Sequence, residues 1–138
     1  MDSVSQPVGV RLAVGGKQGE RVLNATLVYD RSEPYEVRLL FPPGLDHLDL
    51  VLARELLAGG LVSAATFGGM AAWLEGGDRG IVCLGWTSPA GDARLEIPAV
   101  SVACFLDIAY CFVPEGDEPP RTDTDDVIAA ILAEGGAR

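Results

Sequence analysis

Residues 99–112, AVSVACFLDIAYCF, mark the point at which the chain changes from strand-forming to helix-forming, because their apolar positions recur at helical spacing. Only Ser101 and Asp107 interrupt the apolar surface of this predicted helix. A helix that is apolar nearly all round must be covered on more than one side. In a chain of 138 residues we expect another subunit to supply part of that cover, so the sequence predicts a homo-oligomer.

The predicted helix carries two neighbouring apolar stripes. The first stripe contains Val100, Cys104, Ile108 and Cys111. The second contains Phe105, Ala109 and Phe112. We expect residues of both stripes to form the oligomer interface, namely Val100, Cys104, Phe105, Ile108 and Phe112.

Upstream of the helix, apolar and polar residues alternate with the period of two that is typical of a half-buried strand. The alternation covers residues 8–14, 23–29 and 35–41. A glycine-rich turn at residues 15–19 joins the first two strands, which predicts a hairpin. Three strands joined by short loops predict an antiparallel sheet with one covered face.

The middle of the chain adds strands at residues 70–74 and 81–87. The second is so continuously apolar that we expect both its faces to be covered, as in the central strand of a sheet. A turn at residues 88–91 contains Pro89 and Gly91, and it leads into a half-exposed returning strand.

A further strand at residues 48–53 should run into a short helical turn at residues 54–58, which Gly59 and Gly60 would end. Residues 114–122 predict an extended acidic linker to a last helix. The fold class expected from these elements is α+β, with an antiparallel sheet, a long apolar helix and a C-terminal helix, in a single domain over residues 1–138.

The charge balance limits the chemistry that the chain can perform. Twenty acidic residues face ten basic ones, giving a formal net charge of −10, and His47 is the only histidine. Histidine is the usual side chain for acid–base catalysis near neutral pH and for metal binding, and the chain has only one. We therefore expect no enzymatic activity and no cofactor, although some pair of carboxylates able to hydrolyse a substrate remains an alternative.

A metal site is not expected either. Asp123, Asp125 and Glu134 have part of the spacing of a calcium loop, but Val127 and Ile128 occupy positions that need an oxygen ligand and a glycine. A capped helix start explains the acidic residues better.

The cysteines indicate a reducing compartment. Cys83, Cys104 and Cys111 are odd in number and lie in apolar surroundings, which favours free thiols in the cytoplasm. Cys83 with His47 could form a nucleophile and base, but no positive neighbours in the sequence would lower the thiol pKa, so core packing is favoured. The longest apolar stretch is also too short for a transmembrane segment.

Nucleic-acid binding is the main alternative from another class of function. Arg11, Arg21, Arg31 and Arg38 could share a sheet surface, but each has an acidic residue nearby in sequence. A chain this acidic repels phosphate backbones. We therefore expect no nucleic-acid partner.

Several short segments follow one another in a distinctive order and spacing over nearly the whole chain. They are Tyr29-Asp30, Pro34-Tyr35-Glu36-Val37, Ala53-Arg54-Glu55-Leu56-Leu57 with Gly60-Leu61, Ser88-Pro89 with Gly91, Ala93, Leu95 and Pro98-Ala99, and Phe105-Leu106. Taken together, these segments resemble the SsgA-like family of actinomycete sporulation and cell-division proteins.

This resemblance implies a non-enzymatic role in placing and controlling the septation machinery. It implies partners among cell-division proteins, such as the tubulin-like FtsZ that the SsgB-type branch recruits, or other SsgA-like proteins. It also implies a cytoplasmic protein at division septa, with a strongly twisted, Whirly-like fold that assembles as a trimer. The chain could be an SsgB-like protein or a divergent paralogue.

Two residues are candidates for partner binding. Arg54 lies in the matching Ala-Arg-Glu-Leu-Leu segment, and the alternative role for it is an ion pair or cap beside Glu55. Trp73 could be an exposed aromatic anchor, and the alternative is a place in the core.

Overall fold

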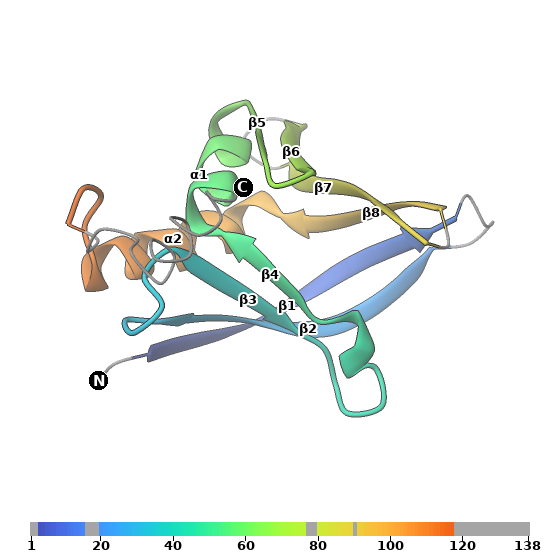
Figure 1. The fold of residues 1–138 in the computed structure, drawn as a ribbon, viewed down its shortest axis with the longest axis horizontal. Helices are drawn as coiled ribbons and strands as arrows, with labels where there is room; N and C mark the ends of the chain where they lie inside the picture. Colours follow the sequence, from blue (N-terminus) through green and yellow to red (C-terminus); the bar gives the residue numbers. More distant parts are fainter. Residues whose placement is uncertain (1–2, 16–19, 77–79, 90, 118–138) are drawn as a thin grey trace, which may run out of the picture.

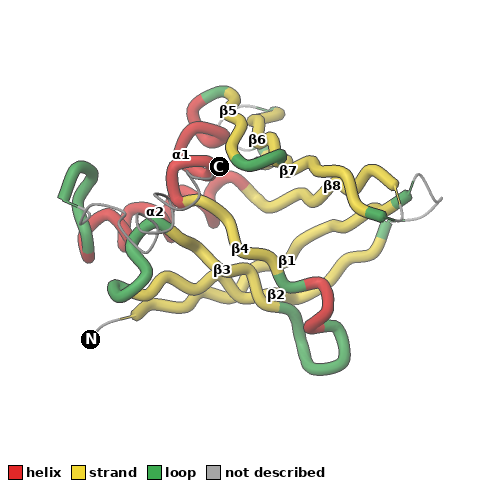
Figure 2. The backbone as a smooth tube through the Cα atoms, in the orientation of Figure 1, coloured by secondary structure: helices red, strands yellow, loops and turns green. Residues whose placement is uncertain are grey.

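The computed structural model describes residues 3–15, 20–76, 80–89 and 91–117. The fold is α+β, as the sequence predicts: an eight-stranded antiparallel sheet and two α-helices (Figures 1 and 2). The elements in chain order are β1 (Ser3–Val14), β2 (Arg21–Asp30), β3 (Glu36–Leu40), a 3-10 turn (Asp46–Leu48), β4 (Leu50–Ala53), α1 (Arg54–Val62), β5 (Ala64–Phe67), β6 (Met70–Glu75), β7 (Ile81–Ser88), β8 (Gly91–Pro98) and α2 (Ala99–Phe112).

The sheet consists of two four-stranded antiparallel meanders, joined where β1 pairs with β8. The strand order is β4-β3-β2-β1-β8-β7-β6-β5. The joining pair runs from Arg11 opposite Glu96 to Val14 opposite Ala93. The β1–β2 and β7–β8 hairpins extend together toward the end of the molecule away from α2 (Figure 1).

The strand alternation predicted from the sequence is confirmed. The expected β1–β2 hairpin forms, with Val8 opposite Ala25 and Val10 opposite Leu23. In β8, Leu95 and Ile97 are fully buried, whereas Arg94 and Glu96, which alternate with them, are only half-buried. One face of the sheet therefore points into the core, and the opposite face is the outer face.

The expectation that residues 81–87 form the central strand is wrong. β1 and β8 occupy the middle of the sheet, and β7 lies between β8 and β6. Its continuous apolar run has another cause: Cys83 points to the outer face, where Trp73 on β6 and Arg94 on β8 lie beside it. Side chains within the sheet provide the cover that a second layer would otherwise supply.

A further expectation fails at the glycine pair. α1 does not end at Gly59 and Gly60 but continues to Val62, and the short strand β5 follows it. The reason is close packing, because a Cβ added at Gly60 would lie 2.6 Å from the Cβ of Ala72 on β6. The glycines let the helix approach the sheet, and the sequence signal for a helix end is overridden.

Both helices pack on the inner face of the sheet. α1 contacts β5 and β6, and α2 contacts β1, β7, β8 and α1. The core side of α2 is formed by Val102, Phe105, Leu106 and Ala109, all buried. The predicted C-terminal helix lies outside the described residues.

Candidate protein-interaction surface

The first apolar stripe of α2 is not covered by any of the residues that the structure describes. Val100 is 62% exposed and Ile108 is 40% exposed. Cys104 and Cys111 are exposed on the same stripe. We name these four residues the α2 stripe. A row of apolar side chains along one helix face is the kind of surface that another protein covers.

The interface residues predicted from the sequence fall into two groups. Val100, Cys104 and Ile108 are on the surface, whereas Phe105 is fully buried in the protomer's own core. The assignment of Phe105 to an oligomer interface is therefore wrong, because its side chain points toward the inner face of the sheet. Phe112 is half-buried. Its ring centroid lies 6.4 Å from that of Tyr29 and 5.2 Å from the Arg31 guanidinium.

Arg54 is a buried structural residue. It begins α1 and is only 1% exposed, so it is not available to a partner. Its Nη1 donates to the carbonyl oxygens of Val113 at 2.6 Å and Ala109 at 3.3 Å, and to the Tyr29 hydroxyl at 3.2 Å. The partner-contact role considered for Arg54 is wrong.

The position of Arg54 explains what it does. The Val113 carbonyl lies just past the C-terminal end of α2, where backbone acceptors lack helical partners and a cation is favourable, and the Ala109 carbonyl also accepts from the Val113 N–H. The guanidinium also stacks 3.9 Å from the centroid of the Tyr110 ring. Arg54 thus caps the other helix and fixes the end of α2 against the start of α1. The sequence indicated a capping role but placed it beside Glu55, which is exposed.

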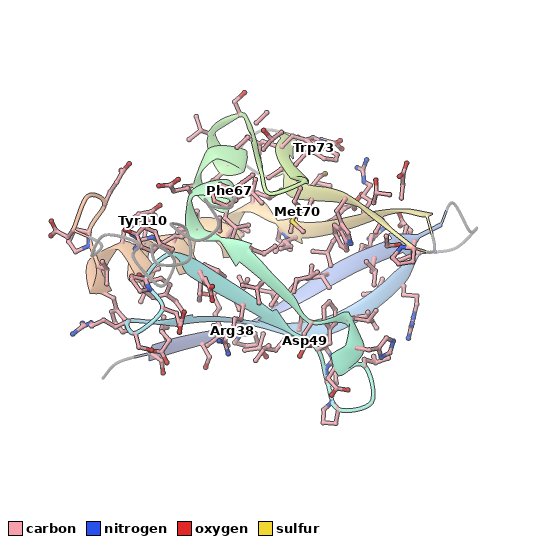
Figure 3. All side chains as sticks on the ribbon, in the orientation of Figure 1. Arg38, Asp49, Phe67, Met70, Trp73 and Tyr110 are labelled. Atoms are coloured by element: carbon pink, nitrogen blue, oxygen red, sulfur yellow. The ribbon has the colours of Figure 1, made fainter. Side chains whose placement is uncertain are left out.

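Trp73 lies on the outer face of β6 and is half-buried. Its indole N–H donates to a Glu75 carboxylate oxygen at 2.8 Å, and the Arg94 guanidinium lies 5.6 Å from its ring. The indole hydrogen bond is the main cause that lowers the pKa of Glu75 below its ordinary value. Trp73 is neither a core residue nor an isolated exposed anchor. Figure 3 shows it on β6, close to the turn that begins with Phe67 and ends with Met70.

The thiol of Cys83 is not a nucleophile in this environment. Burial raises its pKa to about 11, outweighing the nearby Arg94, whose Nη2 lies 3.4 Å from the sulfur. His47 belongs to the 3-10 turn Asp46–Leu48 and is exposed. Across the described residues, no group of three or more histidine, cysteine or acidic side chains could hold a metal ion.

Two of the four arginines considered for nucleic-acid binding are engaged in separate contacts. Arg11 pairs with Glu20 at 3.3 Å, and Arg31 lies over the Phe112 ring. No helix in the described part of the chain has the length and apolar character needed to cross a membrane.

The sheet and the capped helix define an α+β protein, with an apolar stripe on α2 that the described residues do not cover. The family model described as "Streptomyces sporulation and cell division protein, SsgA" matches residues 23–118. The sporulation-specific cell division protein SsgB of Streptomyces coelicolor is 36% identical, over 96% of this chain and 97% of that protein. SsgB of Frankia casuarinae is 34% identical, over 99% of this chain and 96% of that protein.

Solved structures agree with the fold. One, from work on SsgB mutations and longitudinal cell division during sporulation of S. coelicolor, has a TM-score of 0.72 and 35% identity, covering 84% of this chain and 92% of that one. The SsgA-like sporulation-specific cell division protein of Thermobifida fusca has a TM-score of 0.73 and 30% identity, covering 96% of this chain and 95% of that one. The chain belongs to the SsgA family of sporulation and cell division proteins.

Proposed function

We propose that this protein is a non-enzymatic regulator of sporulation-specific cell division that acts by assembling with itself and recruiting a division protein. The single observation that carries the self-assembly is the α2 stripe, which the described part of the protomer leaves uncovered although its residues are apolar. The relatives named as sporulation-specific cell division proteins support the process in which it acts.

Self-assembly follows from the cost of leaving the α2 stripe in water. Burying an apolar side chain stabilises an interface by about 25 cal/mol for each Å² removed from solvent. Val100 and Ile108 lie two helical turns apart, with Cys104 between them, so one partner surface can cover all three. We propose three copies in a Whirly-like arrangement, as the family resemblance implies.

The recruited partner in this proposal is FtsZ, or another SsgA-like protein, at division septa in the cytoplasm. Septation requires division proteins to be placed at defined sites, and an oligomer presents several copies of one binding surface. Several weak contacts then act together as one strong attachment. We propose no nucleic-acid partner, because a net charge of −10 opposes binding to phosphate backbones.

Self-assembly is tested by analytical ultracentrifugation of the wild type and of Ile108→Asp. We expect the wild type to sediment as an oligomer and Ile108→Asp as a monomer, since a charge buried in an apolar contact is strongly unfavourable. Val62→Asp is the matched control, because Val62 is 81% exposed on α1 and outside the stripe. A monomeric wild type, or an oligomeric Ile108→Asp, would contradict assembly through α2.

Thiol labelling gives an independent measurement of the same contact. Cys104 and Cys111 are exposed in the protomer, whereas Cys83 is buried. We expect labelling of Cys104 in the wild-type oligomer to be at least about tenfold slower than in Ile108→Asp, because covering a thiol blocks reagent access. Equal labelling rates would place the contact elsewhere.

Recruitment is tested by co-sedimentation with polymerising FtsZ. We expect the wild type to enter the polymer pellet and Ile108→Asp to enter it several-fold less, through loss of multivalency. Binding of labelled oligonucleotides at moderate salt, without FtsZ association, would instead support the nucleic-acid alternative and overturn the proposal.

A further inference from the structure

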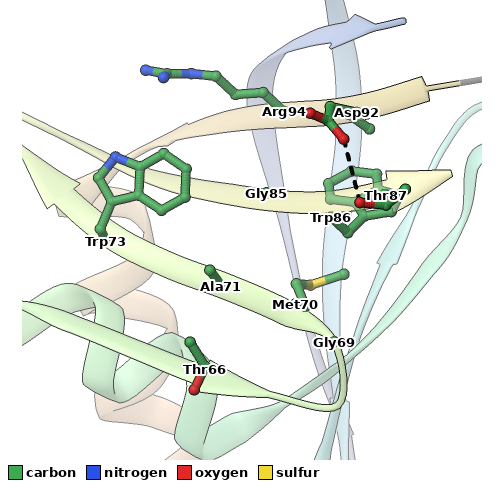
Figure 4. Close-up of a pocket in the computed structure, with 11 residues that line it drawn as sticks. Thr66, Gly69, Met70, Ala71, Trp73, Gly85, Trp86, Thr87, Asp92 and Arg94 are labelled. Carbon is green, nitrogen blue, oxygen red and sulfur yellow. Dashed lines mark hydrogen bonds between the residues drawn. The ribbon is translucent and has the colours of Figure 1, made fainter.

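A groove crosses the outer face of the sheet between Trp73 and the tips of β7 and β8 (Figure 4). Its volume is about 470 Å³. Ala71 and Gly85, which are paired on neighbouring strands, form part of its lining. Met70 and Thr87 line it as well. We name this feature the Trp73 groove.

The groove depends on the absence of a side chain at Gly85. A Cβ at that position would lie 3.2 Å from two carbon atoms of the Trp73 ring. Glycine therefore lets the indole lie across β7 as one wall, and Ala71 beside it is nearly as small. A sheet face with ordinary side chains at these two positions would fill the space that the ring borders.

Trp73 is held in place before any partner arrives. Its N–H is fixed by Glu75, and Arg94 lies beside its ring. Arg94 is itself held by Glu75 at 3.2 Å and by Glu96 at 3.0 Å. A side chain that is already ordered loses little entropy on binding, and tryptophan is among the residues that contribute most to interfaces.

The charges around the groove select the partner. Asp92 and Arg94 line it, and Glu75 and Glu96 contact Arg94. Two carboxylates already engage the Arg94 guanidinium, and the Asp92 carboxylate lies apart from it and accepts a hydrogen bond from the Thr87 hydroxyl at 3.3 Å. The local field favours a cation and opposes a phosphate or an acidic peptide.

We infer that the Trp73 groove docks a segment of a partner protein in which an apolar side chain stands next to a lysine or arginine. The apolar side chain packs on Trp73 above Gly85, and the cation lies near Asp92. This inference rests on the proposed recruiting function and assigns it a surface separate from the α2 stripe.

The chain supplies its own probe for this surface. Trp73 and Trp86 are its only tryptophans; Trp73 forms a wall of the groove, and Trp86 follows Gly85 on β7 and packs against the core. We would titrate the full chain with the peptide Lys-Leu-Lys-Leu-Lys and its acidic counterpart Glu-Leu-Glu-Leu-Glu, following tryptophan emission and the anisotropy of a dye on the peptide. We expect saturable binding of the basic peptide alone, weakening as salt is raised.

Three variants test whether the peptide binds in the Trp73 groove. We expect Trp73→Ala to lower the affinity for the basic peptide at least about tenfold, because the aromatic anchor is lost. Gly85→Ala should also lower this affinity, because the added methyl group takes up space in the groove. Asp92→Asn should lower it by about two- to fivefold, which is typical of losing an exposed charge pair. Asp46→Asn, a remote exposed acid, is the control and should bind as the wild type does.

The outcomes separate this inference from the proposed function. Equal binding of the two peptides, or unchanged affinity in both Gly85→Ala and Asp92→Asn, overturns the docking inference. Ile108→Asp should bind the peptide like the wild type, because it alters only the α2 stripe. If the chain binds the peptide but neither assembles nor associates with FtsZ, the docking inference is supported and the proposed function is contradicted.

Discussion

The two sides of α2 have nearly the same apolar character but opposite surroundings. Val102 and Phe105 are fully buried against the sheet, whereas Val100 and Ile108 face solvent. Hydrophobicity alone therefore does not determine which side of such a helix enters the core. The sheet covers one side, and the remaining apolar surface is available for contacts outside the protomer.

The largest expected effect comes from a substitution on the buried side. Phe105→Ala should lower the free energy of unfolding by about 3–5 kcal/mol, because it leaves a cavity in a closely packed core. The matched change Ile108→Ala should cost less than about 1 kcal/mol in the protomer, since that side chain is partly solvated. Urea unfolding at protein concentrations too low for assembly measures both. Equal losses would remove the distinction between the two sides.

The next effect concerns the end of the same helix. Arg54→Met should lower the free energy of unfolding by about 2–4 kcal/mol, because the carbonyls of Ala109 and Val113 would lose a charged donor in a buried site. Arg38→Met is the control, since Arg38 is exposed on β3 and should change stability by less than about 0.5 kcal/mol. Thermal unfolding followed by circular dichroism measures both. Similar melting temperatures would show that Arg54 does not hold α2 in place.

A smaller effect separates the inner from the outer face of the sheet. Gly60→Ala gains about 1 kcal/mol in helix propensity, but crowding against Ala72 should cost more, so we expect a net loss of about 1–2 kcal/mol. Gly9→Ala on the outer face of β1 meets no atom within 4 Å and should be neutral or stabilising by up to about 1 kcal/mol. The double variant Gly60→Ala with Ala72→Gly should recover part of the loss in denaturant unfolding. No recovery would assign the loss to another cause.

The sequence predicts the elements better than their contacts. The alternation that predicted β1, β2 and β3 is local, and so is the helical period of α2, and all four form. The end of α1 was mispredicted because Gly59 and Gly60 are needed by β5 and β6, which follow later in the chain. The central place expected for β7 was wrong because β1 and β8 meet only through long-range pairing.

The candidate site was only partly predictable for the same reason. Helical spacing correctly grouped the α2 stripe, but it could not say which apolar stripe faces the sheet, so Phe105 was assigned to the wrong side. Arg54 indicated a cap, yet its acceptors belong to a helix more than fifty residues away. The Trp73 groove depends on the pairing of Ala71 with Gly85, which no local pattern reveals.

A further effect concerns burial on the outer face. The folded-state pKa of Cys83 is raised to about 11 from an ordinary value of 9.0, mainly by burial. The folded protein therefore retains the thiol proton at a pH where the unfolded chain releases it. The contribution of the Cys83 thiol to the free energy of unfolding is complete below pH 9.0 and is lost as the pH rises toward its folded-state pKa of about 11.

Stability should consequently fall between these two pH values, and Cys83→Ala should show a shallower fall. The exposed Cys104 provides the control, because Cys104→Ala should leave the pH dependence unchanged. Urea unfolding at intervals across this range measures all three proteins. Identical slopes in the wild type and Cys83→Ala would mean that Trp73 and Arg94 do not shield the thiol, and that only the inner face of the sheet excludes water.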